Sequence, residues 1–266
     1  MPHLPAAFFD LDKTIIARSS TLAFSRPFGR AGLLNRRAVL RSAYAQLVYV
    51  MNGADHDQLE RMRAYLSEMV AGWEVEQVRG IVAETLHDMI DPMVFAEASD
   101  LIEQHRQAGH AVVIVSSSGS EVVEPIGEML GADQVIATQM VIEDGRYTGE
   151  VSFYAYGPMK AEAMRALAQE KGYDLAASYA YSDSFTDLPM LEAVGHPYAV
   201  NPDRALRKAA AERGWPVLSF ARPVALRRRF PGADASTPQK AAAVAVVGAA
   251  TAGLVWYARR RIVRVR

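Results

Sequence analysis

Six polar residues in this chain have the types and the order along the sequence that metal and phosphate chemistry uses. They are Asp10, Asp12, Ser116, Lys160, Asp183 and Asp187. Carboxylates that gather within a few ångströms repel one another, so a cation is needed to keep them ionised, and a set of oxygen ligands favours Mg²⁺. A serine and a lysine beside them would bind phosphate oxygens. Taken singly, each residue also fits an ordinary turn, a helix cap or a solvated surface.

Short apolar runs precede most of these residues and would carry them to one edge of a sheet. The run 6–9 ends at Asp10, the β-branched run 111–115 opens onto Ser116, and the run 179–182 precedes the last two aspartates. A run without polar alternation is typical of a strand that is buried on both faces. In a doubly wound sheet, the polar groups that follow such strands meet in a crevice outside the strand carboxyl ends.

Helical segments alternate with these strands along the second part of the chain. Helices are predicted at 95–108, 121–130 and 160–171, with a short one opened by Pro189. Further strands are predicted at 134–138 and 198–200, and a hairpin turn at 143–146 joins 140–142 to 147–153. We therefore expect an α/β fold with a doubly wound, parallel-sheet, Rossmann-like core that has helices on both faces.

A long helical segment separates the first strand from the rest of this pattern. Apolar residues between 59 and 86 recur at helical rather than strand spacing, which predicts an inserted helical cap. The predicted organisation is a core of 1–18 and 92–221, a cap of 19–91, a linker of 222–239, and a C-terminal apolar helix with a basic end at 240–266.

The candidate residues match a known family in their order and spacing. Asp10-Leu11-Asp12-Lys13-Thr14, Ser116, Lys160 and the segment 182–187 resemble the four motifs of haloacid dehalogenase-type phosphatases. The insertion after the first motif is similar to the cap of the phosphoserine-phosphatase-like branch, subfamily IB of that superfamily. The resemblance covers about residues 4–221.

The resemblance implies a role for each carboxylate. Asp10 would attack phosphorus and form an aspartyl-phosphate, and Asp12 would act as general acid and then as general base. Asp10, the backbone carbonyl of Asp12 and Asp183 would bind Mg²⁺, and Asp187 would support them.

The resemblance also implies how the phosphate group is held and leaves the substrate open. Ser116, Ser117 and Lys160 would hold the phosphoryl oxygens. Phosphoserine phosphatases have an acid nine residues after the nucleophile, which pairs with the substrate ammonium, whereas this chain has Ser19 there. Arg61 and Arg63 of the insertion are either a clamp for a substrate carboxylate or solvated helix positions.

We therefore expect a Mg²⁺-dependent hydrolase of a small phosphomonoester, either phosphoserine-like or a phospholipid monoester. The large apolar residues of the insertion are compatible with a lipid-like leaving group, although most of them would simply pack helices. The alternative from another class is a membrane-anchored interaction protein that keeps the fold without the catalysis.

The composition excludes several other chemistries. The chain has 266 residues and no cysteine, so disulfides, thiolate zinc sites and a cysteine nucleophile are excluded, and an intracellular location is expected. The net charge of −1 hides an asymmetry. Residues 222–266 carry ten basic side chains and one acid, whereas residues 1–221 carry 19 bases and 29 acids.

The basic tail contains a candidate membrane segment. Residues 241–258 carry no charge and would form a helix about 27 Å long, close to the thickness of the bilayer hydrocarbon. Trp256 and Tyr257 lie beside Arg259, as in an aromatic belt, and small residues at every fourth position would allow self-association.

The tail leads us to expect a cytoplasmic protein that contacts a membrane through 240–266. The alternative is a soluble, alanine-rich helix that packs on the body. No nucleic-acid partner is expected, because the basic residues flank an apolar segment and do not alternate with stacking aromatic side chains.

Overall fold

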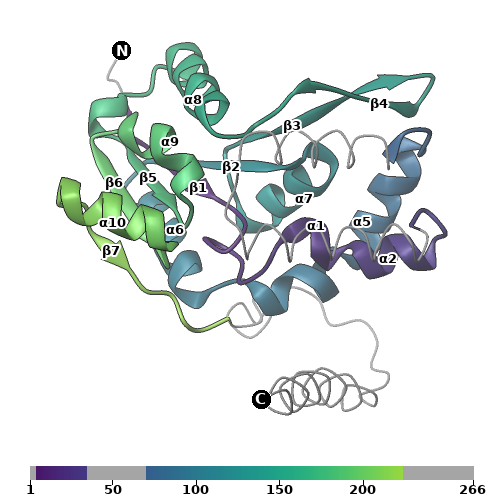
Figure 1. The fold of residues 1–266 in the computed structure, drawn as a ribbon, viewed down its shortest axis with the longest axis horizontal. Helices are drawn as coiled ribbons and strands as arrows, with labels where there is room; N and C mark the ends of the chain where they lie inside the picture. The colour runs from purple at the N-terminus through teal and green to yellow at the C-terminus, as the bar shows by residue number, and fades with distance from the viewer. Residues whose placement is uncertain (1–3, 35–69, 224–266) are drawn as a thin grey trace, which may run out of the picture. The chain divides into compact units, whose positions relative to one another are not determined.

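A seven-stranded sheet forms the centre of the molecule (Figure 1). The computed structural model describes residues 4–34 and 70–223. The strand order is β4-β3-β2-β1-β5-β6-β7, and every neighbouring pair is parallel except the antiparallel β3–β4 pair. The strands are β1 (Ala6–Asp10), β2 (Ala111–Gly119), β3 (Gln134–Glu143), β4 (Arg146–Phe153), β5 (Tyr179–Ser182), β6 (His196–Val200) and β7 (Val217–Leu218). The predicted α/β core is confirmed.

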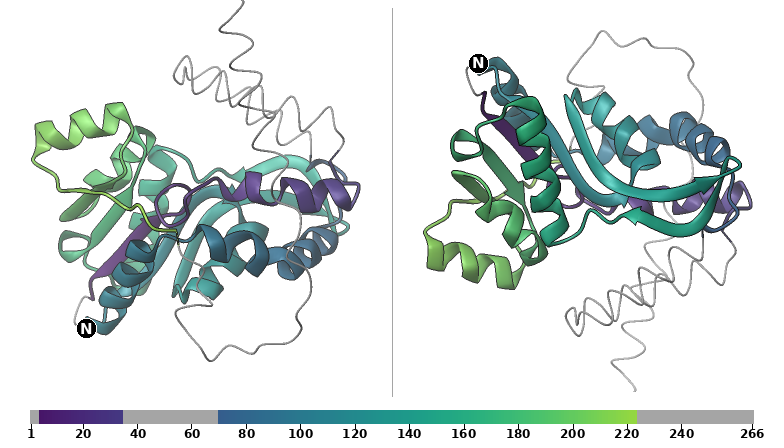
Figure 2. Two further views of the ribbon diagram at one scale, coloured as in Figure 1. Left: turned by 90° about the horizontal axis from the view of Figure 1, so that it is seen from below. Right: turned by 90° about the horizontal axis from the view of Figure 1, so that it is seen from above.

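Helices cover both faces of this sheet (Figure 2). One face packs against α6 (Ala96–Gln107) and α7 (Ser120–Leu130), and the other against α8 (Pro158–Lys171), α9 (Leu188–Glu192) and α10 (Arg204–Arg213). The remaining described helices are α1 (Ser20–Ala23), α2 (Ser25–Arg30), α5 (Val75–Ile90) and the 3₁₀ turns η1 (Asp91–Met93), η2 (Leu175–Ala177) and η3 (Phe185–Asp187).

The residues of the central strand β1 before Asp10 are all apolar because the strand is buried on both of its faces. Ala7 and Phe9 belong to the core beneath α6 and α7, whereas Ala6 and Phe8 belong to the core beneath α8 and α9. Successive side chains of a strand point to opposite faces, so a strand buried on both faces has apolar residues at every position before its end. All five residues of β1 are buried, and this fixes Asp10 firmly at its carboxyl end.

The chain leaves the core and returns to it at one place. The backbone N–H of Ala17 donates to Met93 O at 2.8 Å, and that of Phe95 donates to Ile15 O at 2.9 Å. The segment between these contacts includes α1, α2 and α5, and α5 packs against α7 of the core. Helical periodicity correctly predicted α5, while residues 35–69, with Arg61 and Arg63, lie outside the described residues.

The structure differs from the sequence prediction in four elements. Strand β2 runs to Gly119, whereas the predicted strand ended at 115. The strand predicted at 134–138 and the one at 140–142 form a single strand, β3, which continues into the hairpin. Asp144 and Gly145 at the turn have φ of 49° and 74°, as a two-residue hairpin turn requires. Helix α10 and strand β7 were not predicted, because α10 buries only Leu206 and two alanines and β7 has two residues.

The predicted C-terminal segment 240–266 lies outside the described residues. Among the helices of 4–34 and 70–223, none is long and apolar enough to span a membrane.

A buried histidine links α6 to the sheet. His105 is 6% exposed, and its Nε2 lies 2.8 Å from the hydroxyl oxygen of Tyr181, while its Nδ1 lies 2.9 Å from Nδ1 of His110. Burial, together with the neighbouring His110, lowers the pKa of His105 to about 4. His105 is therefore neutral in the folded protein over the whole range above that pH.

We expect this histidine to make stability depend on pH between about 4 and 6.5. The unfolded chain binds a proton on His105 as the pH falls below its ordinary pKa of 6.5, and the folded protein does not. The free energy of unfolding should therefore fall by roughly 2–3 kcal/mol across this window, relative to His105→Gln. Urea unfolding of both proteins at several pH values measures the difference. Equal slopes for the two proteins would contradict the assignment.

Candidate active site

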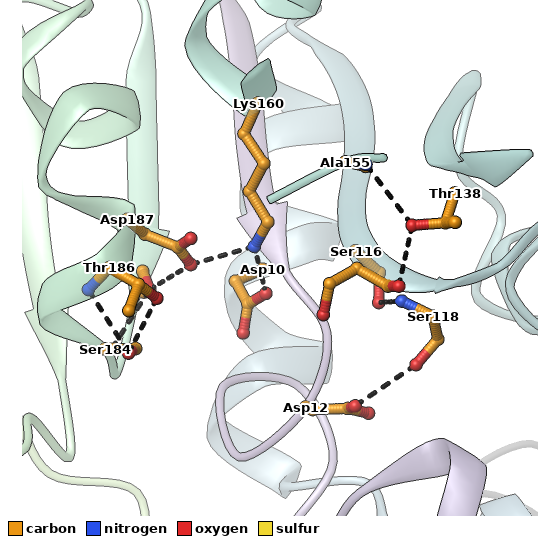
Figure 3. Close-up of polar contacts among 12 residues, drawn as sticks. Asp10, Asp12, Ser116, Ser118, Thr138, Ala155, Lys160, Ser184, Thr186 and Asp187 are labelled. Atoms are coloured by element: carbon orange, nitrogen blue, oxygen red, sulfur yellow. Dashed lines mark hydrogen bonds and ion pairs between the residues drawn. The ribbon is translucent and has the colours of Figure 1, made fainter. Parts of the chain in front are cut away.

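The carboxyl ends of β1 and β5 meet the start of α8 at a buried cluster of charges (Figure 3). Lys160 Nζ donates to Asp10 Oδ1 at 2.7 Å and to Asp187 Oδ2 at 2.9 Å. The hydroxyl of Ser182 donates to the same Asp187 oxygen at 2.7 Å. Asp10, Lys160 and Asp187 are 6%, 2% and 2% exposed. One ammonium group thus joins two carboxylates that are 177 residues apart in the sequence.

The cluster carries more negative than positive charge. Burial raises the pKa of Asp10 to about 8 against the pull of Lys160, and the carboxylates of Asp187 and Asp183 raise it further. Burial likewise raises the pKa of Asp183 to about 7, although Lys13 opposes the shift. Burial disfavours the charge on Lys160, but Asp10 and Asp187 outweigh this and raise its pKa. An ionised Asp10 therefore needs a further positive charge nearby.

Asp12 lies in a different environment from Asp10. Its Oδ1 accepts the backbone N–H of Ser20 at 2.8 Å, and its Oδ2 accepts the hydroxyl of Ser118 at 3.3 Å. Lys13 follows it with a φ of 64°, so the chain turns sharply as soon as it leaves β1. Burial raises the pKa of Asp12, and the Ser20 and Ser118 hydrogen bonds oppose the shift. Of these two aspartates, Asp10 contacts the Lys160 ammonium directly and Asp12 does not.

The serines at the carboxyl end of β2 lie beside Asp10. Val115 pairs with Asp10 in the sheet, which brings Ser116 to the same edge, and Ser116 Oγ accepts the N–H of Ser118 at 3.2 Å. Ser116 is buried, whereas the side chain of Ser117 is exposed and its carbonyl accepts the Thr138 hydroxyl at 2.7 Å.

The structure thus brings together the residues predicted for catalysis, phosphate binding and metal binding, except where they fall outside the described chain. Ser19 is the residue before α1 and makes no capping side-chain hydrogen bond there. Arg61 and Arg63 are not described. Sequence reasoning missed four hydroxyl residues that hold the cluster: Ser20, Ser118, Thr138 and Ser182. Ser20, Ser118 and Ser182 each lie beside a predicted site residue, whereas nothing in the sequence pointed to Thr138.

The donor atoms present fit Mg²⁺. Within residues 4–34 and 70–223, no group of three or more Asp, Glu or His side chains is placed to hold a metal by itself. Mg²⁺ needs no such group, because it uses one or two carboxylates and completes its shell with water and phosphate oxygens. Asp10 and Asp183, with the backbone carbonyl of Asp12, are the groups that could supply such a set, and the charges of Asp183 and Asp187 beside Asp10 favour a divalent cation.

The chain belongs to the haloacid dehalogenase-like hydrolase family, whose model matches residues 7–192. It is 62% identical over 256 residues to a probable phosphatase of Mycobacterium tuberculosis, which covers 96% of this chain and 89% of the relative. A phosphoserine phosphatase of the same organism is 32% identical over 217 residues, 81% of this chain and 70% of the relative. A crystal structure of a Bordetella pertussis protein of unknown function superposes with a TM-score of 0.71 at 29% identity, covering 81% of this chain and 98% of that one.

These similarities confirm the predicted family and the predicted class of enzyme. The chain is a phosphatase of the phosphoserine-phosphatase-like kind. A phosphatase of this fold acts on a small phosphate ester.

The buried charge cluster predicts a large effect of Lys160→Met. Removal of one partner from a buried ion pair leaves an uncompensated charge, so we expect the free energy of unfolding to fall by about 3–5 kcal/mol. Adding Asp187→Asn should recover part of this loss, because the asparagine removes one of the carboxylates and its side-chain oxygen can still accept the Ser182 hydroxyl. Urea unfolding of the wild type, both single variants and the double variant measures the coupling. Additive effects would contradict the cluster.

Proposed function

We propose that this phosphatase hydrolyses its substrate through an aspartyl-phosphate on Asp10. The observation that carries the proposal is the buried chain of contacts Asp10–Lys160–Asp187, which fixes the Asp10 carboxylate at the carboxyl end of the central strand. A carboxylate held this way is pre-oriented, and much of the entropy cost of bringing nucleophile and phosphorus together is already met.

Two carboxylates perform the chemistry in two steps. A carboxylate oxygen of Asp10 attacks phosphorus, the bond from phosphorus to the ester oxygen breaks, and Asp12 donates a proton to that oxygen as it leaves. Asp12 then removes a proton from a water molecule, the water oxygen attacks the same phosphorus, and the bond to Asp10 breaks. Inorganic phosphate leaves, and both carboxyl groups return to their starting states.

The surrounding residues hold the phosphoryl group during both steps. Ser116, Ser117 and Lys160 donate hydrogen bonds to its oxygens as negative charge develops. When bound by Asp10, Asp183 and the Asp12 carbonyl, Mg²⁺ supplies positive charge that polarises the phosphoryl group and keeps Asp10 ionised. Asp187 orients Lys160 through the contact described above.

The substrate class that we propose is a small phosphomonoester, either phosphoserine-like or a phospholipid monoester. The relative named as a phosphoserine phosphatase supports the first. Ser19, at a position where an acid would pair with the substrate ammonium, and the apolar composition of 19–91 favour the second. We also propose that residues 1–18 and 92–221 form the core and that residues 19–91 form a cap that selects the leaving group.

We expect Asp10→Asn to abolish phosphate release. The amide has the shape of the carboxylate and none of its nucleophilicity, so activity should fall by at least about 10³-fold. Phosphate release is measured with Mg²⁺ from phosphoserine, lysophosphatidate and other phosphomonoesters. A matched control is Asp144→Asn in the β3–β4 turn, where φ is 49° and asparagine is well tolerated. Near wild-type activity of Asp10→Asn would rule out the aspartyl-phosphate.

The same panel tests the alternative function. A protein that keeps the fold only for interaction would release no phosphate from any ester, with or without Mg²⁺. Removal of the metal with a chelator should abolish turnover, and readdition should restore it.

We further propose that residues 240–266 contact a membrane, on the basis of the uncharged run 241–258 between basic residues. The full-length protein should sediment with membranes at neutral pH, whereas a variant that ends at residue 239 should not. Retention after alkaline carbonate extraction would indicate a spanning helix rather than one that lies on the surface. Release of the full-length protein would rule out a spanning helix.

A further inference from the structure

One hydroxyl group stands at the centre of the contacts around Asp12. Ser118 Oγ lies 3.3 Å from Asp12 Oδ2, 2.9 Å from Ser20 Oγ and 3.2 Å from Thr21 Oγ1. Ser118 is 7% exposed and Ser20 is completely buried. Figure 3 shows Ser118, near the carboxyl end of β2, reaching down towards Asp12.

The stoichiometry of hydrogen bonding sets the direction of these contacts. A serine hydroxyl has one proton to donate and two lone pairs to accept with. When Ser118 donates to Asp12, its other two contacts are satisfied only if Ser20 and Thr21 donate to it. The hydroxyls of Ser20 and Thr21 then donate to Ser118, and Ser118 donates to the Asp12 carboxylate. Hydrogen bonds that are linked in this way strengthen one another.

These contacts fix the plane of the Asp12 carboxyl group. The Ser20 N–H holds Oδ1 and the Ser118 hydroxyl holds Oδ2, so rotation about the last side-chain bond breaks at least one hydrogen bond. The partners come from α1 and from the carboxyl end of β2, so the orientation of Asp12 is set by two other segments of the chain.

We propose that Ser118 is a positioning residue that orients Asp12 for proton transfer, and that α1 acts on Asp12 through it. This inference rests on the proposed role of Asp12 as general acid. A hydroxyl suits the task because it can rotate. It donates to the ionised carboxylate and can accept from the protonated carboxyl group, so the contact can persist in both states. Loss of this contact leaves Asp12 held at one oxygen.

Substrates with different leaving groups distinguish a role of Ser118 in proton transfer from a purely structural role. An alkyl phosphate has a strongly basic leaving oxygen that needs a proton from Asp12, whereas p-nitrophenolate leaves with little assistance. Because kcat/KM reports only the steps up to the first irreversible one, it isolates transfer of the phosphoryl group to Asp10. General acid catalysis contributes about 10²–10⁴-fold, so misorientation of Asp12 should cost part of that for the alkyl ester alone.

The experiment uses the full-length protein with Mg²⁺ and two probes, glycerol 2-phosphate and p-nitrophenyl phosphate. We expect Ser118→Ala to lower kcat/KM for glycerol 2-phosphate about 10–50-fold more than for p-nitrophenyl phosphate. Ser118→Thr, which keeps the hydroxyl, should restore most of the ratio. Thr21→Val, at an exposed position, should shift the ratio by a few fold in the same direction without endangering the fold.

The matched control is Ser120→Ala at the first residue of α7, whose hydroxyl donates to Glu121 at 3.1 Å and not to Asp12. This variant should leave the ratio of the two probes unchanged. Thermal unfolding of each variant checks that the fold is intact.

The outcomes separate this inference from the proposed function. Equal loss on both esters, or no loss in both Ser118→Ala and Thr21→Val, overturns the role of Ser118 while the phosphatase mechanism stands. If Asp12→Asn and the wild type have the same ratio of kcat/KM for the two probes, Asp12 is not the general acid. The inference about Ser118 then fails as well.

Discussion

Two buried carboxylates at one edge of the sheet share a single buried ammonium, and the Asp183 carboxylate adds to the negative charge near Asp10. The rest of the site is arranged around this imbalance. Water would screen these charges at low cost, but Asp10, Lys160 and Asp187 are almost fully enclosed. Buried ion pairs seldom stabilise a protein more than apolar side chains of similar volume would. The cluster is therefore better explained by chemistry than by stability. A divalent cation and a phosphate group, entering together, would complete its charge.

The sheet holds the charged residues of this cluster in place. Strand β1 packs against cores on both of its faces, so Asp10 has little freedom to withdraw towards water when its charge is unfavourable. The parallel arrangement of β1 and β5 then places Asp183 and Ser182 at the same edge, and α8 begins there with Lys160. The apolar core thus supplies the constraint, and the polar residues at the strand ends act within it.

Much of this arrangement could be predicted from the sequence, because the apolar runs and the polar residues after them are read from consecutive positions. Strands β1, β2 and β5 and the residues at their ends follow from that pattern. The hydroxyl partners could not be predicted. In the segment 116–120, four serines surround one glycine, and only the fold distinguishes Ser118, which faces Asp12, from Ser117, which faces solvent. Helix α10 was missed for a related reason, since its few apolar positions give a weak periodicity.

Asp10 and Asp12 are two residues apart, yet their surroundings suit them to different tasks. Asp10 contacts an ammonium group directly, which favours its ionised form and so suits the proposed nucleophile. Asp12 has only neutral partners in contact, an amide N–H and a hydroxyl, and a hydroxyl can face either protonation state. Surroundings of this kind suit a group that must donate and then accept a proton, because a cation in contact would favour its ionised form. The different partners of the two carboxylates are therefore as important to the proposed reaction as the carboxylates themselves.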